Sequence, residues 1–216
     1  VRRPGAWNSE FLAHNWGIEK ETAERTLRAT TQRGVRSFDG QEVGVQRRFP
    51  TGDRHLQYRR LNHAMYHDTL FSTIASTRKN KCSHVYATDF CWSKNFPLKS
   101  KGDAHHTLDE LFHRYGVPTR LLSDDAKELT QGEFARKARQ AQCLIDMTDP
   151  YSPWQNQAET EVRELKRLSG RWMVKKRSPK KLWDYCLELC SEVRSNTAHN
   201  VYQLKGQVPE TLMTGE

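Results

Sequence analysis

The sequence predicts an α/β protein in which a mixed five-stranded sheet is flanked by helices. Three short strand-like runs come first, and single strands then alternate with segments of helical periodicity. The chain has 216 residues, which is enough for one good core and a small appendage. Mean hydropathy is low at −0.88, but six Trp, eight Phe and seven Tyr supply large side chains for a core and argue against disorder.

Residues 9–34 predict two short helices around a tight turn. Ser9 is suited to cap the first helix, and Gly17 is suited to end it. Two helices joined by a glycine turn, with Arg25 and Arg28 exposed on the second, resemble a helix-turn-helix that contacts DNA. Any small helical hairpin gives the same pattern, so this signal for DNA contact is weak.

The composition changes after this hairpin. Gly, Asp, Gln and Arg dominate the following segment and its periodicity is lost, which predicts a linker. We therefore expect a helical hairpin at 1–36, a linker at 37–61, the main α/β domain at 62–178 and a C-terminal helical extension at 179–216.

The main domain alternates strands and helices in a recognisable order. In sequence we expect strands at Met65–Phe71, 83–92 and 94–99 with a turn at Ser93, a helix at 104–115, a strand at 119–123, a helix at 132–143, a strand at Leu144–Met147 and a long helix from about 154 to 176. This is the order of a ribonuclease H-like domain. The first three strands of such a sheet are antiparallel and the later ones are parallel.

The chain is strongly basic, with a formal charge of +9 and a sequence pI near 9.4. The cations gather in two segments, which contain Arg47, Arg48, Arg54, Arg59 and Arg60, and then Arg163, Lys166, Arg167, Arg171, Lys175, Lys176, Arg177, Lys180 and Lys181. Basic clusters of this kind fit a polyanionic substrate, and nucleic acid is the leading choice. The alternative is that they form ordinary solvated helix faces.

The five cysteines form no C-x-x-C pair and are odd in number. This pattern indicates a reducing compartment, and it argues against a disulfide framework and against a cysteine-based zinc site. No apolar run approaches the roughly 18 residues that a membrane span needs, so no membrane partner is expected. The chain begins and ends within a pattern, so we expect a fragment of a longer polypeptide.

Three acidic residues on different elements predict a metal-dependent site. Two-metal phosphoryl transfer needs carboxylates from several elements, because no single strand or helix can surround both ions. Asp68 on the first strand, Asp124 at the end of the fourth and Glu159 on the following helix meet this need. Because all of these ligands are oxygens, Mg²⁺ or Mn²⁺ suits them better than zinc does.

The two aspartates each have a rival. Asp89 also ends a predicted strand, but it precedes a hairpin turn, where aspartate commonly makes local hydrogen bonds. Asp68 is therefore favoured over Asp89. Asp124 is favoured over Asp125 because it lies nearer the strand, although Asp125 stays open.

Helical geometry bears on the glutamate. The apolar stripe of the long helix consists of Ala158, Val162, Leu165 and Trp172. Glu159 lies about 100° from this stripe, in line with Arg163 and Lys166. Glu161 lies on the opposite flank. An acid followed along the helix by two cations fits phosphate binding, and ordinary i,i+4 pairing is the alternative, so Glu159 is favoured.

Several segments, in order, match one protein family. They are His67-Asp68, VYATDF, FPLKSKGDAH, YGVP, RLLSDDAKELT, PYSPWQNQAE, LWDYCLELCSEVRSNTAHN and VPETLMTGE. Across residues 62–216 the chain thereby resembles the integrase of copia-type LTR retrotransposons, within the retroviral integrase superfamily.

The resemblance implies a function and a set of roles. Asp68, Asp124 and Glu159 match the family's catalytic, metal-binding positions, which are expected to hold Mg²⁺ or Mn²⁺, as two ions. Arg163 and Lys166 match its DNA-contacting helix, and Lys175, Lys176 and Arg177 are expected to add contacts to the DNA backbone. The implied activity is transfer of an element's 3′-hydroxyl end onto target DNA. Because integration joins paired DNA ends, a homo-oligomer is expected. The expected location is the host nucleus, with a cytoplasmic particle before integration.

The chain departs from the family pattern at three points. It has Asp124-Asp125-Ala126 where the family often has Asp-Asn-Gly, and 34 residues separate Asp124 from Glu159 where 35 are usual. The pair Asp125 and Glu161 has 35 intervening residues, so this pair stays open. The His-His-Cys-Cys zinc module is absent. Two other functions remain: a decayed or repurposed DNA-binding protein, and a ribonuclease H-like nuclease or transposase.

Overall fold

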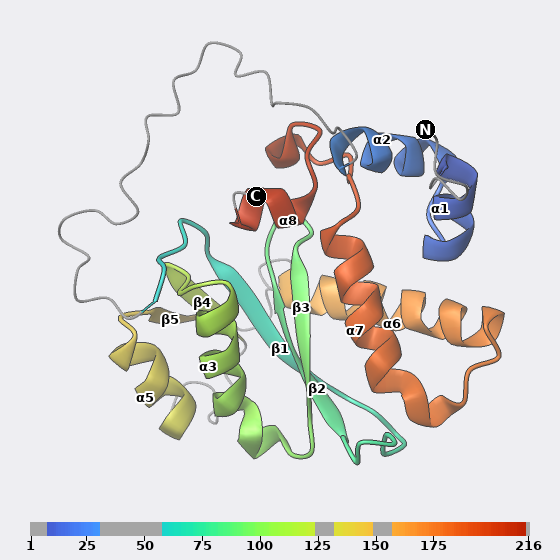
Figure 1. Ribbon diagram of the computed structural model, residues 1–216. Coiled ribbons are helices and arrows are strands. Elements are labelled where there is room, and N and C mark those ends of the chain that lie inside the picture. The colour runs from blue at the N-terminus through green and yellow to red at the C-terminus, as the bar shows by residue number, and fades with distance from the viewer. Residues whose placement is uncertain (1–7, 31–57, 124–131, 149–156, 215–216) are drawn as a thin grey trace, which may run out of the picture.

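Five strands form one mixed sheet in the computed structural model, which describes residues 8–30, 58–123, 132–148 and 157–214 (Figure 1). The strands are β1 (Met65–Phe71), β2 (Cys82–Ala87), β3 (Ser93–Leu98), β4 (Arg120–Ser123) and β5 (Leu144–Met147), in the order β3-β2-β1-β4-β5. β1 pairs antiparallel with β2, and β2 with β3, whereas β1–β4 and β4–β5 are parallel. The predicted change from antiparallel to parallel pairing is confirmed.

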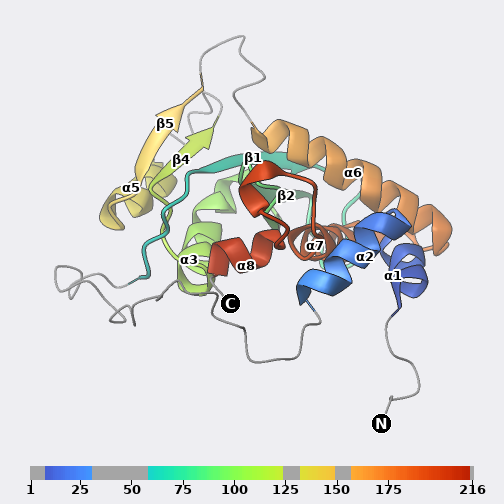
Figure 2. The same ribbon diagram turned by 90° about the horizontal axis from the view of Figure 1, so that it is seen from above.

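Helices cover both faces of this sheet, as Figure 2 shows from above. The longer ones are α1 (Ser9–Trp16), α2 (Lys20–Thr30), α3 (Ala104–Arg114), α5 (Gly132–Gln140), α6 (Gln157–Lys175) and α7 (Trp183–Ser195). The short α8 (Pro209–Thr214) and the 3-10 turns η1 (Lys101–Asp103), η3 (Lys180–Leu182) and η4 (Tyr202–Leu204) complete the described elements. None of the described helices is long and apolar enough to cross a bilayer.

The core is divided by the sheet into two apolar clusters. Side chains alternate along a strand, so neighbouring residues of β2 enter different clusters. Tyr86 packs with Leu108 of α3 and Phe134 of α5, whereas Val85 packs with Leu165 of α6. Every residue of β2 is buried, because the helices cover both of its faces.

The turn between the second and third strands differs from the sequence prediction. The second strand ends at Ala87 and does not run on to 92, because Thr88 and Trp92 close a turn: the Thr88 N–H donates to the Trp92 carbonyl at 2.9 Å. Ser93 is therefore the first residue of β3 and not the turn itself. Within that turn Cys91 has φ of 65°, a left-handed conformation that strand periodicity does not reveal.

The N-terminal hairpin forms as predicted and is attached to the main domain. The Asn8 side chain, and not Ser9, caps α1 by accepting the Phe11 N–H at 2.7 Å. Gly17 ends α1 in the left-handed conformation with φ of 66°, and a Cβ there would lie 3.2 Å from Nε1 of Trp172 on α6. The left-handed φ and the close approach of the backbone to Trp172 both favour glycine at this position.

Candidate catalytic site

Asp68 lies in the middle of β1, on the face that α6 covers. Its neighbour His67 points to the opposite face, where its ring stacks on Phe134 of α5 with centroids 5.1 Å apart. Leu70, two residues after Asp68 and on the same face, packs in the cluster that contains Val162 of α6. Asp68 is half-buried, and its Oδ1 accepts the backbone N–H of the next residue at 2.6 Å.

Glu159 lies in the first turn of α6, which packs against β1 and β2. Its side chain is 55% exposed, and its Oε1 lies 3.9 Å from Nη2 of Arg163, one turn further along. The apolar stripe predicted for this helix is confirmed in Ala158, Val162 and Leu165, which are buried. Asp68 and Glu159 therefore belong to two elements that are in contact.

Asp124 and its rival Asp125 lie outside the described residues, and Ser123 is the last described residue before them. The parallel pairing of β1 with β4 sets Tyr66 opposite Leu122. In the sequence, Asp68 and Asp124 each follow this pair by two residues. Among the described residues, no three His, Cys, Asp or Glu side chains gather as a metal site.

Asp89 lies in the turn between β2 and β3 and is exposed. The prediction that it ends a strand is wrong, because β2 stops two residues earlier. Its place in a tight turn agrees with the local hydrogen-bonding function that is common for aspartate there.

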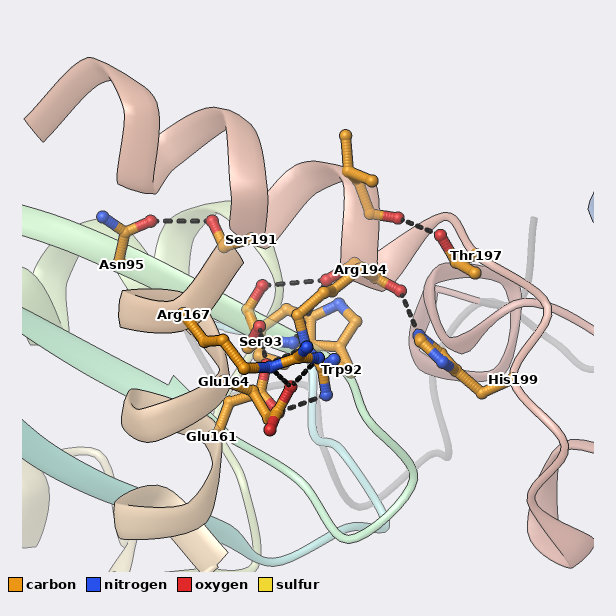
Figure 3. Close-up of polar contacts among 12 residues, drawn as sticks. Trp92, Ser93, Asn95, Glu161, Glu164, Arg167, Ser191, Arg194, Thr197 and His199 are labelled. Carbon is orange, nitrogen blue, oxygen red and sulfur yellow. Dashed lines mark hydrogen bonds and ion pairs between the residues drawn. The ribbon is translucent and has the colours of Figure 1, made fainter. Parts of the chain in front are cut away.

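Glu161 is buried in a polar network that joins three elements (Figure 3). Arg194 of α7 donates from Nε and Nη2 to its two carboxylate oxygens, at 2.5 and 2.7 Å. Ser93 of β3 donates its hydroxyl to the same carboxylate at 2.8 Å. Ser195 in turn donates to the Ser93 carbonyl at 2.8 Å and accepts the Ser93 N–H at 3.1 Å. The start of α6 is thereby fixed to α7 and to β3.

The charge of Arg194 is stabilised by this network. Burial opposes the charged form, but the Glu161 carboxylate, with smaller contributions from Cys91 and Glu164, offsets that cost, and the pKa of Arg194 is raised. The Arg194 carbonyl lies 2.9 Å from Nε2 of His199 (Figure 3), and burial together with the charge of Arg194 lowers the pKa of that histidine. Helical spacing places Glu161 on the opposite flank of α6 from Arg163. Its ion-pair partner Arg194 lies 33 positions away, so no local sequence pattern predicts this pair.

The cations predicted to bind DNA are exposed, in α6 and in the turn after it. They are Arg163, Lys166, Lys175, Lys176 and Arg177. The Lys175 ammonium also donates to the His14 carbonyl of α1 at 2.5 Å, which holds the hairpin against the end of α6. On the hairpin, Arg28 is exposed as predicted, whereas Arg25 is half-buried because α2 packs against the C-terminal segment.

Two histidines are buried on the opposite face of the sheet from Asp68. Burial lowers the pKa of His67 to about 3, and neither of its ring nitrogens has a hydrogen-bond partner among the described residues. His84 is also buried, and its Nδ1 lies 2.8 Å from the Thr69 hydroxyl. Burial is the largest cause that lowers the pKa of His84 well below its ordinary range. Both rings are therefore neutral core groups at pH 7.

Solved structures of other proteins have a similar fold. No protein-family model and no curated protein matches the chain. Among solved structures, the HTLV-2 integrase catalytic core domain in complex with magnesium, in its trimeric form, matches 71% of this chain and 97% of its own, with a TM-score of 0.54 and 14% identity. The dimeric form of that domain gives 0.52 and 13%, over 72% of this chain and 97% of its own.

A simian T-cell lymphotropic virus intasome, in complex with PP2A regulatory subunit B56 gamma, gives a TM-score of 0.56 and 16% identity. That match covers 74% of this chain and 60% of the other. Likeness at these identities concerns the fold. Together with the strand order and the helices on both faces, it shows that the chain has the ribonuclease H-like fold of retroviral integrase catalytic cores.

Proposed function

We propose that the chain is the catalytic core of a copia-type LTR retrotransposon integrase, which binds DNA and joins element ends to target DNA. The arrangement of its acids carries the proposal. Asp68 lies on β1, Glu159 lies on the helix packed against β1, and Asp124 follows the strand that pairs with β1. The order of the matching sequence segments and the fold of the solved integrase cores support the same function.

The residues present fit a divalent metal. Asp68, Asp124 and Glu159 offer only carboxylate oxygens, which are the ligands of Mg²⁺ and Mn²⁺. Two such ions, when bound, would polarise the attacking 3′-hydroxyl and stabilise the leaving oxygen. The chain itself would bind and orient the DNA: Arg163 and Lys166 extend from the same helix as Glu159 and would hold phosphates beside it.

The network around Glu161 supports Glu159 as the catalytic glutamate. Three donors, two from Arg194 and one from Ser93, already occupy the Glu161 carboxylate, and its side chain is only 8% exposed. Metal binding by Glu161 would remove this carboxylate from a buried guanidinium, which is costly. Glu159, by contrast, is exposed.

The proposal includes assembly and location. Because integration joins two DNA ends, we propose that more than one copy of the chain acts together. The HTLV-2 core is described in trimeric and dimeric forms, which supports oligomer formation by this fold. We further propose that the chain acts in the nucleus of the host cell.

A strand-transfer assay with matched aspartate variants tests the proposal. The substrate is a duplex with the terminal sequence of the encoding element, incubated with target DNA and Mg²⁺ or Mn²⁺. Asp124→Asn should reduce transfer to background while leaving DNA affinity within about twofold, because a metal ligand is lost and the cations remain. Asp125→Asn is the matched control and should stay active. Activity that survives in Asp124→Asn and is lost in Asp125→Asn would show that the aspartate is wrongly assigned.

Two further arms separate the alternatives. Cleavage of an RNA–DNA hybrid without transfer of element ends would indicate a ribonuclease H-like nuclease. Titration with millimolar Mn²⁺ should stabilise an intact site by roughly 1–3 kcal/mol, measured by thermal unfolding. Absence of both stabilisation and transfer would indicate a chain that only binds DNA.

A further inference from the structure

A cationic cleft separates α2 from the segment that leads into α8, away from the proposed catalytic residues. Its volume is about 500 Å³. Arg25 and Arg28 of α2 line one side, and Lys205, Gln207 and Thr211 line the other. The described residues that line it include three cations and no carboxylate, so the cleft is suited to an anion.

The α2 side of the cleft is held in place by two hydrogen bonds. Thr26 of α2 is buried, and its hydroxyl accepts the Ala198 N–H at 2.9 Å, which joins α2 to the C-terminal segment. Within α2, Nη2 of Arg25 donates to the Thr22 hydroxyl at 3.0 Å, which orients the guanidinium. Figures 1 and 2 both show α2 beside the C-terminal segment, so the two walls are neighbours in space.

Arg25 has unused hydrogen-bonding capacity. Its Nε is buried and has no hydrogen-bond partner among the described residues. A buried donor without an acceptor is unfavourable, and a guanidinium offers several N–H groups in a geometry that matches phosphate. Arg25 lines the cleft, so an oxyanion bound there would pair with the charge of its guanidinium.

An exposed aromatic ring lies in the same turn as Lys205, which lines the cleft. Tyr202, the first residue of η4, is 91% exposed. The N–H of Lys205 donates to the Tyr202 carbonyl at 3.3 Å, so ring and ammonium belong to one tight turn. Cations that bind phosphates beside an open aromatic face are the combination that binds unpaired nucleotides, because every base can stack on such a ring.

We propose that this cleft binds single-stranded nucleic acid. A phosphate of the strand lies against Arg25, Arg28 and Lys205, and an adjacent base stacks on Tyr202. A duplex fits less well, because its base faces are hidden within the stack. This binding needs neither metal nor the residues Asp68, Asp124 and Glu159. It can therefore be tested independently of the proposed strand transfer.

Photocrosslinking and binding in EDTA test this proposal with the full chain. A thymidine oligonucleotide that carries 5-iodouracil should crosslink to the peptide that contains Tyr202. In fluorescence anisotropy, Tyr202→Ser should weaken binding of the oligonucleotide by about 5- to 150-fold and leave an abasic strand of equal length unaffected. The double variant Arg28→Gln/Lys205→Gln should weaken both strands and lower the slope of log affinity against log salt by about 1.4.

Arg139→Gln is the matched control, because Arg139 is an exposed cation on α5, outside the cleft. Circular dichroism of each variant shows whether its fold is kept. Crosslinks confined to other peptides, or equal affinities of the double variant and the control, would overturn the proposal. The same holds if tripolyphosphate displaces the strand while Tyr202→Ser has no effect, since the cleft would then bind free phosphate.

Discussion

Removal of Arg194 tests whether the buried network secures α6. Arg194→Met keeps much of the side chain's apolar length but leaves the Glu161 carboxylate in the core without its two strongest donors. The Ser93 hydroxyl, at 2.8 Å, would be the acid's only remaining partner of the three described. The variant should therefore be strongly destabilised.

The magnitude follows from the burial of the pair. The Arg194 and Glu161 side chains are only 14% and 8% exposed, so solvent screens their interaction little. Removing one partner from a buried pair costs about 3–5 kcal/mol. For a domain of this size that corresponds to a fall in Tm of roughly 6–20 °C. Urea unfolding followed by circular dichroism gives the free energy of unfolding, and calorimetry gives Tm.

A second ion pair on the same helix provides the control. Glu164 and Arg167 form an ion pair (Figure 3). Their Oε2 and Nη2 atoms are 2.6 Å apart, but their side chains are 32% and 50% exposed. Arg167→Met should cost less than about 1 kcal/mol, because exposed pairs contribute little. Adding Glu161→Gln to Arg194→Met should restore part of the loss by removing the buried charge. If Arg194→Met and Arg167→Met lose equal stability, the network does not secure the helix.

Two further predictions concern acid and glycine. Because burial holds the pKa of His67 near 3, the unfolded chain alone binds a proton at this residue between its ordinary pKa of 6.5 and pH 3. The contribution of a neutral His67 to stability is therefore complete above pH 6.5 and is lost as the pH falls, by about 2 kcal/mol at pH 5. His67→Phe should reduce this loss, whereas the exposed control His106→Gln should keep it. Urea unfolding at pH 7 and at pH 5 measures the loss for each variant. Gly116→Ala should destabilise by more than about 1 kcal/mol in the same assay at pH 7, because φ is +118° and the new Cβ would lie 2.6 Å from the Arg59 carbonyl oxygen. Gly170→Ala, at an open position of α6, should instead stabilise by about 0.5–1 kcal/mol, and equal effects of the two would refute this account.

Periodicity was sufficient to predict much of the fold. β1 and β5 have the predicted bounds, because each is a short run whose neighbours break the strand pattern. The apolar stripe of α6 predicted which of its residues face the sheet, because helical spacing fixes direction. Pairing direction also followed, since helices inserted between later strands require parallel connections.

The errors arose where a local interaction competes with periodicity. The β2–β3 turn depends on the bond between Thr88 and Trp92 and on a left-handed Cys91, which apolar spacing does not encode. Asn8 and not Ser9 caps α1. Either side chain could accept the Phe11 N–H, and helix boundaries predicted from sequence are uncertain by one or two residues. The half-burial of Arg25 reflects the packing of α2 against the C-terminal segment. Thr26 of α2 contacts Ala198 there, 172 residues further along the chain.

The choice between Glu159 and Glu161 as the proposed metal ligand depends on both the sequence and the structure. A spacing of 35 residues favours the pair Asp125 and Glu161, whereas helical direction favours Glu159. Glu161 and Arg194 form a charge pair that is largely shielded from solvent, and this pair would have to break before Glu161 could bind a metal. The same pair holds the first turns of α6 in place, and Glu159 extends from them into solvent two residues earlier. We therefore infer that Glu161 positions the first turns of α6, and Glu159 stays the proposed metal ligand despite the shorter spacing.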